Sequence, residues 1–440
     1  MTPLVGVLVL ILLGLAGARI SFGAGGPLVR RLPLSAGMHL LFLGFILGTH
    51  VLGLLTREVI DQLYPFLALG LGWIGLLFGL QLDRRHLREF PRAFLWLALA
   101  QALVTFGVFW GLGEVAMALL PGVPRQARIG LLAAAATACV STPVAIALVA
   151  DTYRVRGRLA QLLFFVASLD AIVGILALQA TYAFHHPHTF RALAVLPVTL
   201  PALAPVAWLL LATGLGIAFG VLFLGLTRPE PEREELVLFL LGLVIFAGGA
   251  ALYMGVSPLF VCGIAGAVLT NLSPLRRQVY VLLQGWEKPT YAILLILAGA
   301  LLHFPSWIIL PLGLLYVLVR MLGKLAGGWV GTRVTRLRFS APGDVGLALL
   351  PQGGISIAMA ISVTLSYPAL RLDGGLLLGE IVFSTVVLGV LASELVGPLL
   401  TRNVLRRAGE ISPRTEDQVA EGVGTPGAGF PAAQRRRSEE

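Results

Sequence analysis

The segment 138–178 combines residue types from which an ion site inside a membrane can be built. Its first apolar run is interrupted by Ser141, Thr142 and Pro143, and its second run carries Asp170 as its single charged residue. A carboxylate at the centre of a membrane span costs about 2.5–3.5 kcal/mol on insertion scales, and such residues are usually functional. A Pro-interrupted span beside an intramembrane acid is typical of transporter ion sites.

Asp170 could bind a proton and a cation in turn. A low dielectric disfavours the charged form of a carboxylate, so a buried Asp170 could take up and release a proton. When ionised it is a hard oxygen ligand that suits a small monovalent cation. A site that holds either a proton or a cation, but never both, is the minimum that an antiporter requires. The alternative is a structural Asp170 that a buried Arg or Lys neutralises.

A second apolar segment, 344–367, is also interrupted near its middle. The interruption contains Pro351, Gln352, Gly353 and Gly354. Pro removes a backbone donor, and Gly weakens a helix interior by about 1 kcal/mol. Within a membrane such breaks are tolerated where they line a polar site. Among the candidate membrane spans of the chain, the two interrupted segments are the fifth and the twelfth. Because seven is an odd number of crossings, they are predicted to cross the membrane in opposite directions, as inverted-topology repeats do.

Two basic residues, Arg320 and Lys324, lie four positions apart within a further apolar segment, 306–330. This spacing places them on one helix face. Arg320 stays protonated and is expected to act as a counter-charge or gate. Lys324 could either take part in the ion site or extend its ammonium group to the membrane surface.

Composition identifies the class of protein. Of 440 residues, 57% are hydrophobic and 12% are charged, whereas soluble domains carry about 25% charged residues. This predicts an all-α polytopic membrane protein and excludes a soluble enzyme. The net charge of +10 does not indicate nucleic-acid binding, because the basic residues lie mostly in short loops. Cys139 and Cys262 fall inside apolar segments, so neither a disulfide framework nor a metal cluster is expected, and no cofactor is predicted.

Thirteen apolar segments are long enough to be candidate spans. They are 3–20, 34–55, 63–82, 92–120, 127–150, 159–184, 196–226, 236–254, 256–272, 289–304, 306–330, 344–367 and 375–401. Most Lys and Arg residues fall in alternate loops, which places the N-terminus outside and the C-terminus in the cytoplasm of a cell membrane. Residues 1–402 are then the membrane transport domain, and 403–440 a disordered cytoplasmic tail.

The other polar residues within or beside the spans give weaker signals. Glu394, Glu380, Gln179 and Glu114 are expected to be interfacial or entrance groups. The run of His185, His186 and His188 is expected to lie in a solvated outside loop.

Several stretches resemble the superfamily of monovalent cation:proton antiporters, in particular bacterial sodium/proton and potassium-efflux-like members. They are LPLSAGMHLLFLGFILG, LGWIGLLFGLQLD, VSTPVAIAL, SLDAIVGILAL, GVSPLFVCGIAGAVLTN, RMLGKLAGGWVGT and GLALLPQGGISIAMAIS, and they occur in the family's order over most of residues 30–400.

The resemblance implies a homodimer that exchanges Na⁺ or K⁺ for H⁺ by elevator-like alternating access. It implies dimerisation (panel) helices at about 1–90 and 236–304, core helices at about 92–184 and 306–401, and a linker helix at about 196–226. Asp170 would bind the cation at the crossing of the two broken helices, with Ser141 and Thr142 beside it. Either Arg320 or Lys324 would be the family's basic residue.

The chain departs from the family pattern at three places. Leu169 stands where Asp, Asn or Gln usually precedes the aspartate, Thr142 stands at the acidic position of some members' TDP triplet, and Gln352-Gly353-Gly354 replaces Arg-Gly-Glu. With one titratable acid, electroneutral one-for-one exchange is expected. Two other functions remain open: a symporter of an organic anion held by Arg320 and Lys324, and a cation channel or non-transporting sensor with a structural Asp170.

Overall fold

The computed structural model describes residues 38–185, 205–227, 231–336, 344–372 and 375–412, apart from positions 50, 56, 121, 303 and 305. The expected span 3–20, the residues His186 and His188, and the tail from 413 onward lie outside these residues. The described part is almost wholly helical, with two isolated β-bridges, Gly48–Leu55 and Arg371–Leu377. The all-α prediction is confirmed.

The helices follow the expected spans closely. They are α3 (Met38–Leu47), α4 (Arg57–Gln62), α5 (Tyr64–Leu80), α6 (Arg84–Glu89), α7 (Arg92–Leu119), α8 (Ala127–Cys139), α9 (Pro143–Thr152), α10 (Arg158–Phe184), α11 (Pro205–Leu226), α12 (Arg233–Tyr253), α13 (Pro258–Leu272), α14 (Arg276–Leu301), α15 (Ile309–Thr335), α16 (Asp344–Ala348), α17 (Gly354–Ser366) and α18 (Leu378–Arg407). Among the described residues, seven helices, counting α8 and α9 as one, are long and apolar enough to cross a membrane, and several shorter helices are apolar as well.

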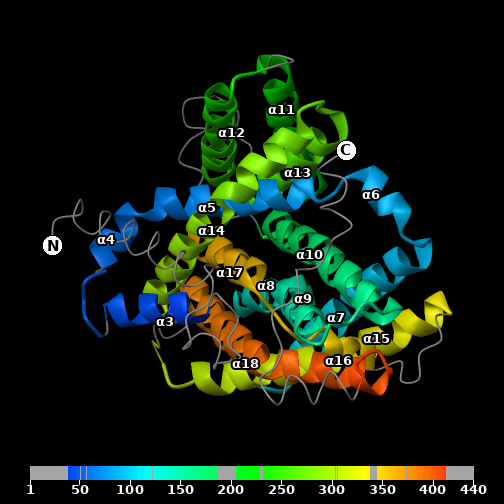
Figure 1. Cartoon of the computed structure of the whole chain (residues 1–440). Helices are drawn as coiled ribbons and strands as arrows, with labels where there is room; N and C mark the ends of the chain where they lie inside the picture. The colour runs from blue at the N-terminus through cyan, green and yellow to red at the C-terminus, as the bar shows by residue number, and fades with distance from the viewer. Residues whose placement is uncertain are drawn as a thin grey trace.

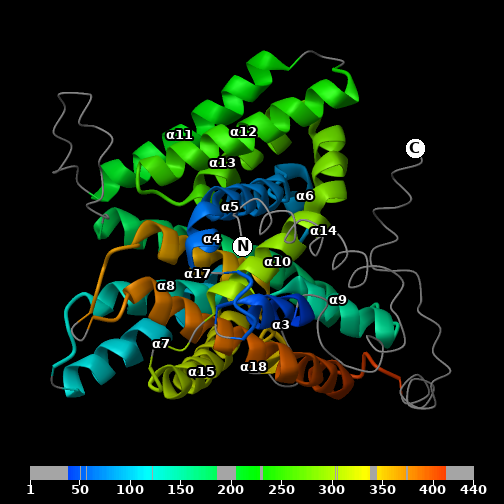
Figure 2. The same cartoon turned by 90° about the vertical axis from the view of Figure 1, so that its left-hand side faces the viewer.

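The helices pack in two groups. In the first group, α5 lies against α12, α13 and α14, and α3 lies against α14; we call these five the panel helices. In the second group, α7 to α10 and α15 to α18 pack on one another; we call these the core helices. Helix α11 packs mainly on α12 and α13 and also contacts α10. Figures 1 and 2 show α11, α12, α13 and α5 at the top, and α7, α15 and α18 at the opposite side of the molecule.

Both predicted interruptions are present. The first separates α8 from α9 at residues 140–142, and the second separates α16 from α17 at residues 349–353. Pro143 lies just beyond the first break, as the first residue of α9. Its missing N–H is harmless there, because the first helical N–H groups have no partner inside the helix.

Three boundaries differ most from the expected ones. Helix α3 ends at Leu47, well before the expected residue 55. The segment before Pro289, expected to be a loop, is helical, and α14 runs without a break from Arg276 to Leu301 with Pro289 inside it. Helix α18 continues past residue 402 to Arg407, so the structured region extends into the segment expected to be a tail.

The chain after α18 folds back onto the start of α10. The Glu410 carboxylate accepts hydrogen bonds from the backbone N–H groups of Leu159, at 2.7 Å, and Ala160, at 3.0 Å. These belong to the first turn of α10, where N–H groups have no helical partner and the helix dipole favours a negative charge. Glu410 therefore caps the helix that carries Asp170.

We expect Glu410→Ala to lower the free energy of unfolding by about 1–2 kcal/mol, because it removes this cap. Thermal unfolding of the detergent-solubilised protein measures the change. Gly157→Ala tests the same contact from the other side, since a Cβ atom at Gly157 would lie 1.9 Å from Glu410 Cδ. Unchanged melting temperatures for both variants would contradict the capping role.

Candidate ion site

The two interrupted segments meet each other directly. The backbone N–H of Thr142 donates to the Pro351 carbonyl at 3.0 Å. The two breaks leave four helix ends in the membrane interior. The C-termini of α8 and α16 expose carbonyl groups there, and the N-termini of α9 and α17 expose N–H groups. In a membrane these groups must be bonded within the protein.

Asp170 lies at the first break, with its side chain fully buried. Its Oδ1 accepts from the Ser141 backbone N–H at 3.0 Å, and its Oδ2 accepts from the Ser141 hydroxyl at 2.6 Å. The carboxylate therefore binds the interruption itself and not a regular helix face. Ser141 Oγ also lies 2.8 Å from the Leu349 carbonyl, which ties the second break to the same residue.

Lys324 completes the contacts of Asp170. Its Nζ atom lies 3.0 Å from Asp170 Oδ2, and neither side chain is exposed. It also lies 2.6 Å from the Cys139 carbonyl and 2.7 Å from Ser141 Oγ. An ammonium group has three donors, so all of them are used. Lys324 does not extend to the membrane surface.

Arg320 bonds the ends of the broken helices and makes no hydrogen bond to Asp170. Its Nε donates to the Ala138 carbonyl at 3.1 Å, one terminal nitrogen donates to the Val140 carbonyl at 2.8 Å, and the other donates to the Leu350 carbonyl. The C-terminal end of a helix carries a partial negative charge. The guanidinium group thus supplies both the donors and the charge that the C-termini of α8 and α16 need.

Close packing of α15 on α7 holds the side chains of Arg320 and Lys324 in place. On α15, Gly323 and Gly327 recur four positions apart and face the backbone of α7: a Cβ atom at Gly323 would lie 3.1 Å from the Thr105 carbonyl oxygen, and one at Gly327 would lie 2.6 Å from that of Gln101. Small residues at this spacing let membrane helices approach closely. Arg320 and Lys324 lie on the same face of α15 as these glycines, at the i, i+3, i+4, i+7 spacing, so the close approach of α7 keeps both side chains fully buried.

Gln352 forms a separate polar cluster at the second break. Its Nε2 lies 2.8 Å from the Thr137 carbonyl, 2.8 Å from the Tyr316 hydroxyl and 2.9 Å from Ser356 Oγ. Its Oε1 is buried and has no hydrogen-bond partner in the described structure. A buried acceptor without a partner is costly, so this atom marks a place where a donor or a cation would be stabilised.

The predicted site residues come together, with a division of roles that the sequence left open. Ser141 contacts the carboxylate of Asp170, whereas the Thr142 hydroxyl accepts from Val144 N–H and caps α9. Lys324 is the partner of Asp170, and Arg320 the partner of the helix ends. The pattern of residue types did not reveal which backbone carbonyls accept hydrogen bonds from Arg320 and Lys324. The only signal in the sequence was the position of the two breaks, where carbonyl groups lose their helical partners.

A cavity of about 360 Å³ lies between panel and core helices beside the crossing. Thr142, Gln352, Gly353 and Gly354 line it, as does Glu394 of α18. The Glu394 side chain, expected to be interfacial, is instead 4% exposed. Asp170 is not among the lining residues, so in this conformation it is closed off behind Ser141 and Lys324.

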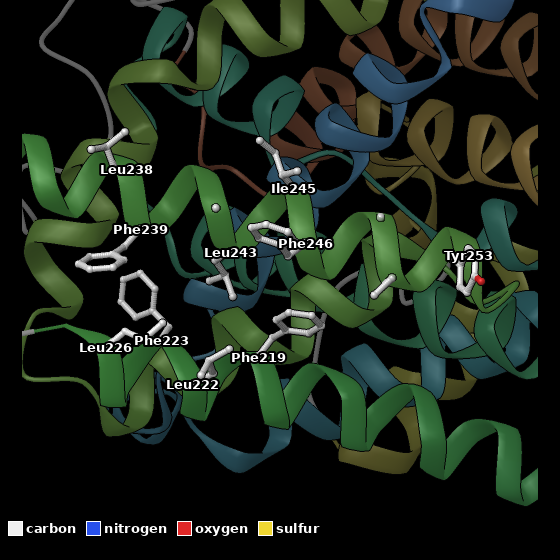
Figure 3. Close-up of a pocket in the computed structure, with 13 residues that line it drawn as sticks. Phe219, Leu222, Phe223, Leu226, Leu238, Phe239, Leu243, Ile245, Phe246 and Tyr253 are labelled. Atoms are coloured by element: carbon white, nitrogen blue, oxygen red, sulfur yellow. The ribbon is translucent and has the colours of Figure 1, made fainter. Parts of the chain in front are cut away.

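A larger hollow, of about 890 Å³, lies between α11 and α12. Figure 3 shows it lined by Phe219, Leu222, Phe223, Phe239 and Phe246. Its lining is apolar apart from the Tyr253 hydroxyl, so it offers no ligands for an ion.

Two further polar residues were expected at outer edges. Glu114 lies 3.2 Å from Arg128 in a partly exposed ion pair. Gln179 is fully buried, and its Oε1 accepts from the Ser257 N–H at 3.1 Å. It therefore connects α10 to the start of α13, because the first turn of α13 needs an acceptor.

The fold thus combines two broken helices that contact each other with a buried Asp170–Lys324 pair. The model of the transmembrane sodium/hydrogen exchanger family matches residues 18–407. The chain belongs to this family. It is therefore a multi-pass membrane protein of a family of transporters, not of enzymes, and the predicted membership of the cation:proton antiporter superfamily is confirmed.

Solved structures show the same fold. The sodium proton antiporter MjNhaP1 from Methanocaldococcus jannaschii at pH 8 is 16% identical, with 93% of this chain and 99% of that chain covered and a TM-score of 0.70. A second structure of MjNhaP1, from a 3D EM map, is 16% identical, with 88% and 94% covered and a TM-score of 0.58. A comparison with curated protein sequences finds no significant match.

We expect Arg320→Lys to destabilise the protein by at least about 3 kcal/mol, because one ammonium group cannot replace a guanidinium fork that bonds three carbonyls at separate helix ends. Thermal unfolding in detergent measures this loss. Arg333→Lys is the matched control, since Arg333 lies on the same helix, is exposed and stacks on Trp329. Equal melting temperatures for the two variants would show that Arg320 does not hold the crossing together.

Proposed function

We propose that this protein exchanges a monovalent cation, Na⁺ or K⁺, for H⁺, with Asp170 binding the cation and the proton alternately. The observation that carries the proposal is a fully buried carboxylate that bonds an interrupted helix and a lysine ammonium group. The ammonium group is itself a monovalent cation, so the oxygen atoms around it are already arranged for one.

The exchange follows from competition between a cation and a proton for Asp170. Lys324 occupies Asp170 Oδ2 and Ser141 Oγ, and an incoming cation must displace it to reach them. Protonation of Asp170 removes the negative charge that holds the cation. Cation and proton thus exclude each other at one carboxylate, which couples their movements in opposite directions.

The bonding of the two basic residues speaks against an organic-anion symporter. Arg320 donates to three carbonyls, and Lys324 to a carbonyl, a hydroxyl and Asp170. An anionic substrate would have to break these bonds. The described residues that line the adjacent cavity include the carboxylates of Glu287 and Glu394 and no basic side chain, so this cavity favours cations.

The packing supports the division into panel and core. The core helices would carry Asp170 across the membrane in an elevator-like movement against the panel helices, with α11 as linker and the panel helices forming a homodimer. Helix α6 carries Arg84 and Arg85, and the loop between α9 and α10 carries Arg154 and Arg156. We call this end of the bundle the basic face and propose that it is cytoplasmic.

Asp170→Asn is expected to abolish exchange, because an amide neither binds a proton reversibly nor carries the charge that holds a cation. The measurement is dissipation of an imposed pH gradient in proteoliposomes when Na⁺ or K⁺ is added. Glu234→Gln, at an exposed position in the first turn of α12, should behave like the unmodified protein.

Cation-dependent exchange that persists in Asp170→Asn would overturn the role of this residue. Cation flux without proton movement in the unmodified protein would indicate a channel, and the absence of any flux would indicate a sensor.

We also expect the exchange to be electroneutral. If Lys324 keeps its proton while Asp170 alternates between proton and cation, one positive charge leaves for each one that enters. The initial rate should then be the same when a membrane potential of either sign is imposed with K⁺ and valinomycin, using Na⁺ as the transported cation. A rate that changes with the sign of the potential would show that more than one proton moves for each cation.

A further inference from the structure

We propose that Glu394 forms a second monovalent-cation site, separate from Asp170, in the cavity between panel and core helices, where a cation is held before it reaches Asp170. The proposal deepens the exchange function and rests on it for the order of events. The existence of the site can be tested without transport.

The first observation is the position of the carboxylate. Glu394 lies near the middle of α18 and is 4% exposed. Helix α18 packs tightly on the second break one turn further along, where a Cβ atom at Gly397 would lie 2.7 Å from Pro351 Cγ. A carboxylate at this depth in a membrane is expensive and indicates a function.

The second observation is the set of oxygen-bearing side chains among the residues that line the same cavity. Thr142 and Gln352 line it together with Glu394. The Thr142 hydroxyl borders Gly353, where a Cβ atom would lie 2.8 Å from Thr142 Oγ1. The Oε1 of Gln352 is buried without a hydrogen-bond partner. A hydroxyl, an amide oxygen and a carboxylate are ligands of a hard cation, and one buried negative charge matches a monovalent ion.

The third observation is the electrostatic setting of Glu394. The N-terminal ends of α9 and α17, at Thr142 and Gly353, border the cavity, and their partial positive charges stabilise an ionised carboxylate. Glu394 is also near enough to Arg320 to interact with it electrostatically. In its ionised form Glu394 supplies the negative charge that a cation at this position requires.

The fourth observation is the direction in which the cavity opens. Gln81 follows the end of α5, and Glu287 lies on the early part of α14; both line the cavity, and Glu287 is exposed. Helix α6 follows α5 directly, so the mouth lies toward the basic face. A cation that enters from this side meets Glu287 first, then Glu394 and the crossing, with Asp170 beyond them.

Cation binding can be measured in protein whose first site is disabled. In purified Asp170→Asn protein, NaCl or KCl should raise the melting temperature relative to choline chloride at equal ionic strength, since oxygen ligands cannot coordinate the methylated nitrogen of choline directly. In the double variant Asp170→Asn, Glu394→Gln the rise should vanish. A rise of equal size in both variants, or none in Asp170→Asn, would overturn the proposal.

Transport gives an independent readout. Glu394→Gln should raise the apparent KM for the cation at least about tenfold, a difference of about 1.4 kcal/mol in binding, with little change in maximal rate, and Glu394→Asp should restore part of the affinity. Glu380→Gln is the matched control, because Glu380 lies on the same helix but lines a different cavity. An unchanged KM, or a lower maximal rate at unchanged KM, would show that Glu394 is not a cation ligand.

These outcomes separate the two proposals. If Asp170→Asn still exchanges cations, the role of Asp170 fails while the binding measurement on Glu394 still holds. If Asp170→Asn is inactive and shows no cation-dependent stabilisation, the exchange function stands and the second site fails.

Discussion

The structure depends on how the backbone groups freed at the two breaks are bonded inside the membrane. No water is available there, so the carbonyl groups at the ends of α8 and α16 need donors from the protein. Arg320 and Lys324 supply them, and their charges in turn need buried anions. Among the described residues, the buried ionisable side chains of Asp, Glu, Lys and Arg are Asp170, Glu394, Arg320 and Lys324. Their charges sum to zero when all four are ionised, and three of the four, Asp170, Arg320 and Lys324, bond directly to the breaks.

This arrangement also bears on the proposed exchange of a cation at the buried Asp170–Lys324 pair. Removing one partner of an isolated buried pair costs about 3–5 kcal/mol, because the other charge is left without a partner. Lys324 is not isolated: its ammonium group is shared between Asp170, the Cys139 carbonyl and Ser141 Oγ. When a cation takes its place at Asp170, the Cys139 carbonyl remains as an acceptor. The competition between Lys324 and a cation is therefore closer to balance than a two-partner salt bridge would allow.

The sequence was sufficient for the fold class, which follows from composition. It also located both breaks and the acid beside the first one, Asp170, because each is a local violation of an apolar pattern. It could not assign Arg320 and Lys324, since both lie on one helix face and their partners include backbone carbonyls some 180 residues away. Nor could it show that Glu394 is buried, because the cavity that Glu394 lines is formed by residues from distant parts of the chain. The extension of α18 to Arg407 was missed because its last turn is polar, and the capping contact of Glu410 with α10 lies beyond the apolar pattern.

The packing within each group differs from the packing between them. Within the panel, backbones touch: a Cβ atom at Gly75 would lie 2.3 Å from the Leu259 carbonyl oxygen, and one at Gly44 would lie 2.0 Å from that of Ile296. Within the core, one at Gly346 would meet the Lys324 carbonyl oxygen at 1.9 Å. At the crossing, by contrast, the panel reaches Gly354 through the hydroxyl of a side chain, Tyr291, and a cavity fills much of the remaining space. Interlocked backbones resist sliding, whereas side-chain contacts across a cavity can be exchanged. This packing is compatible with the proposed movement of each group as a rigid unit, and it places Glu394 and the crossing beside the cavity between the two groups.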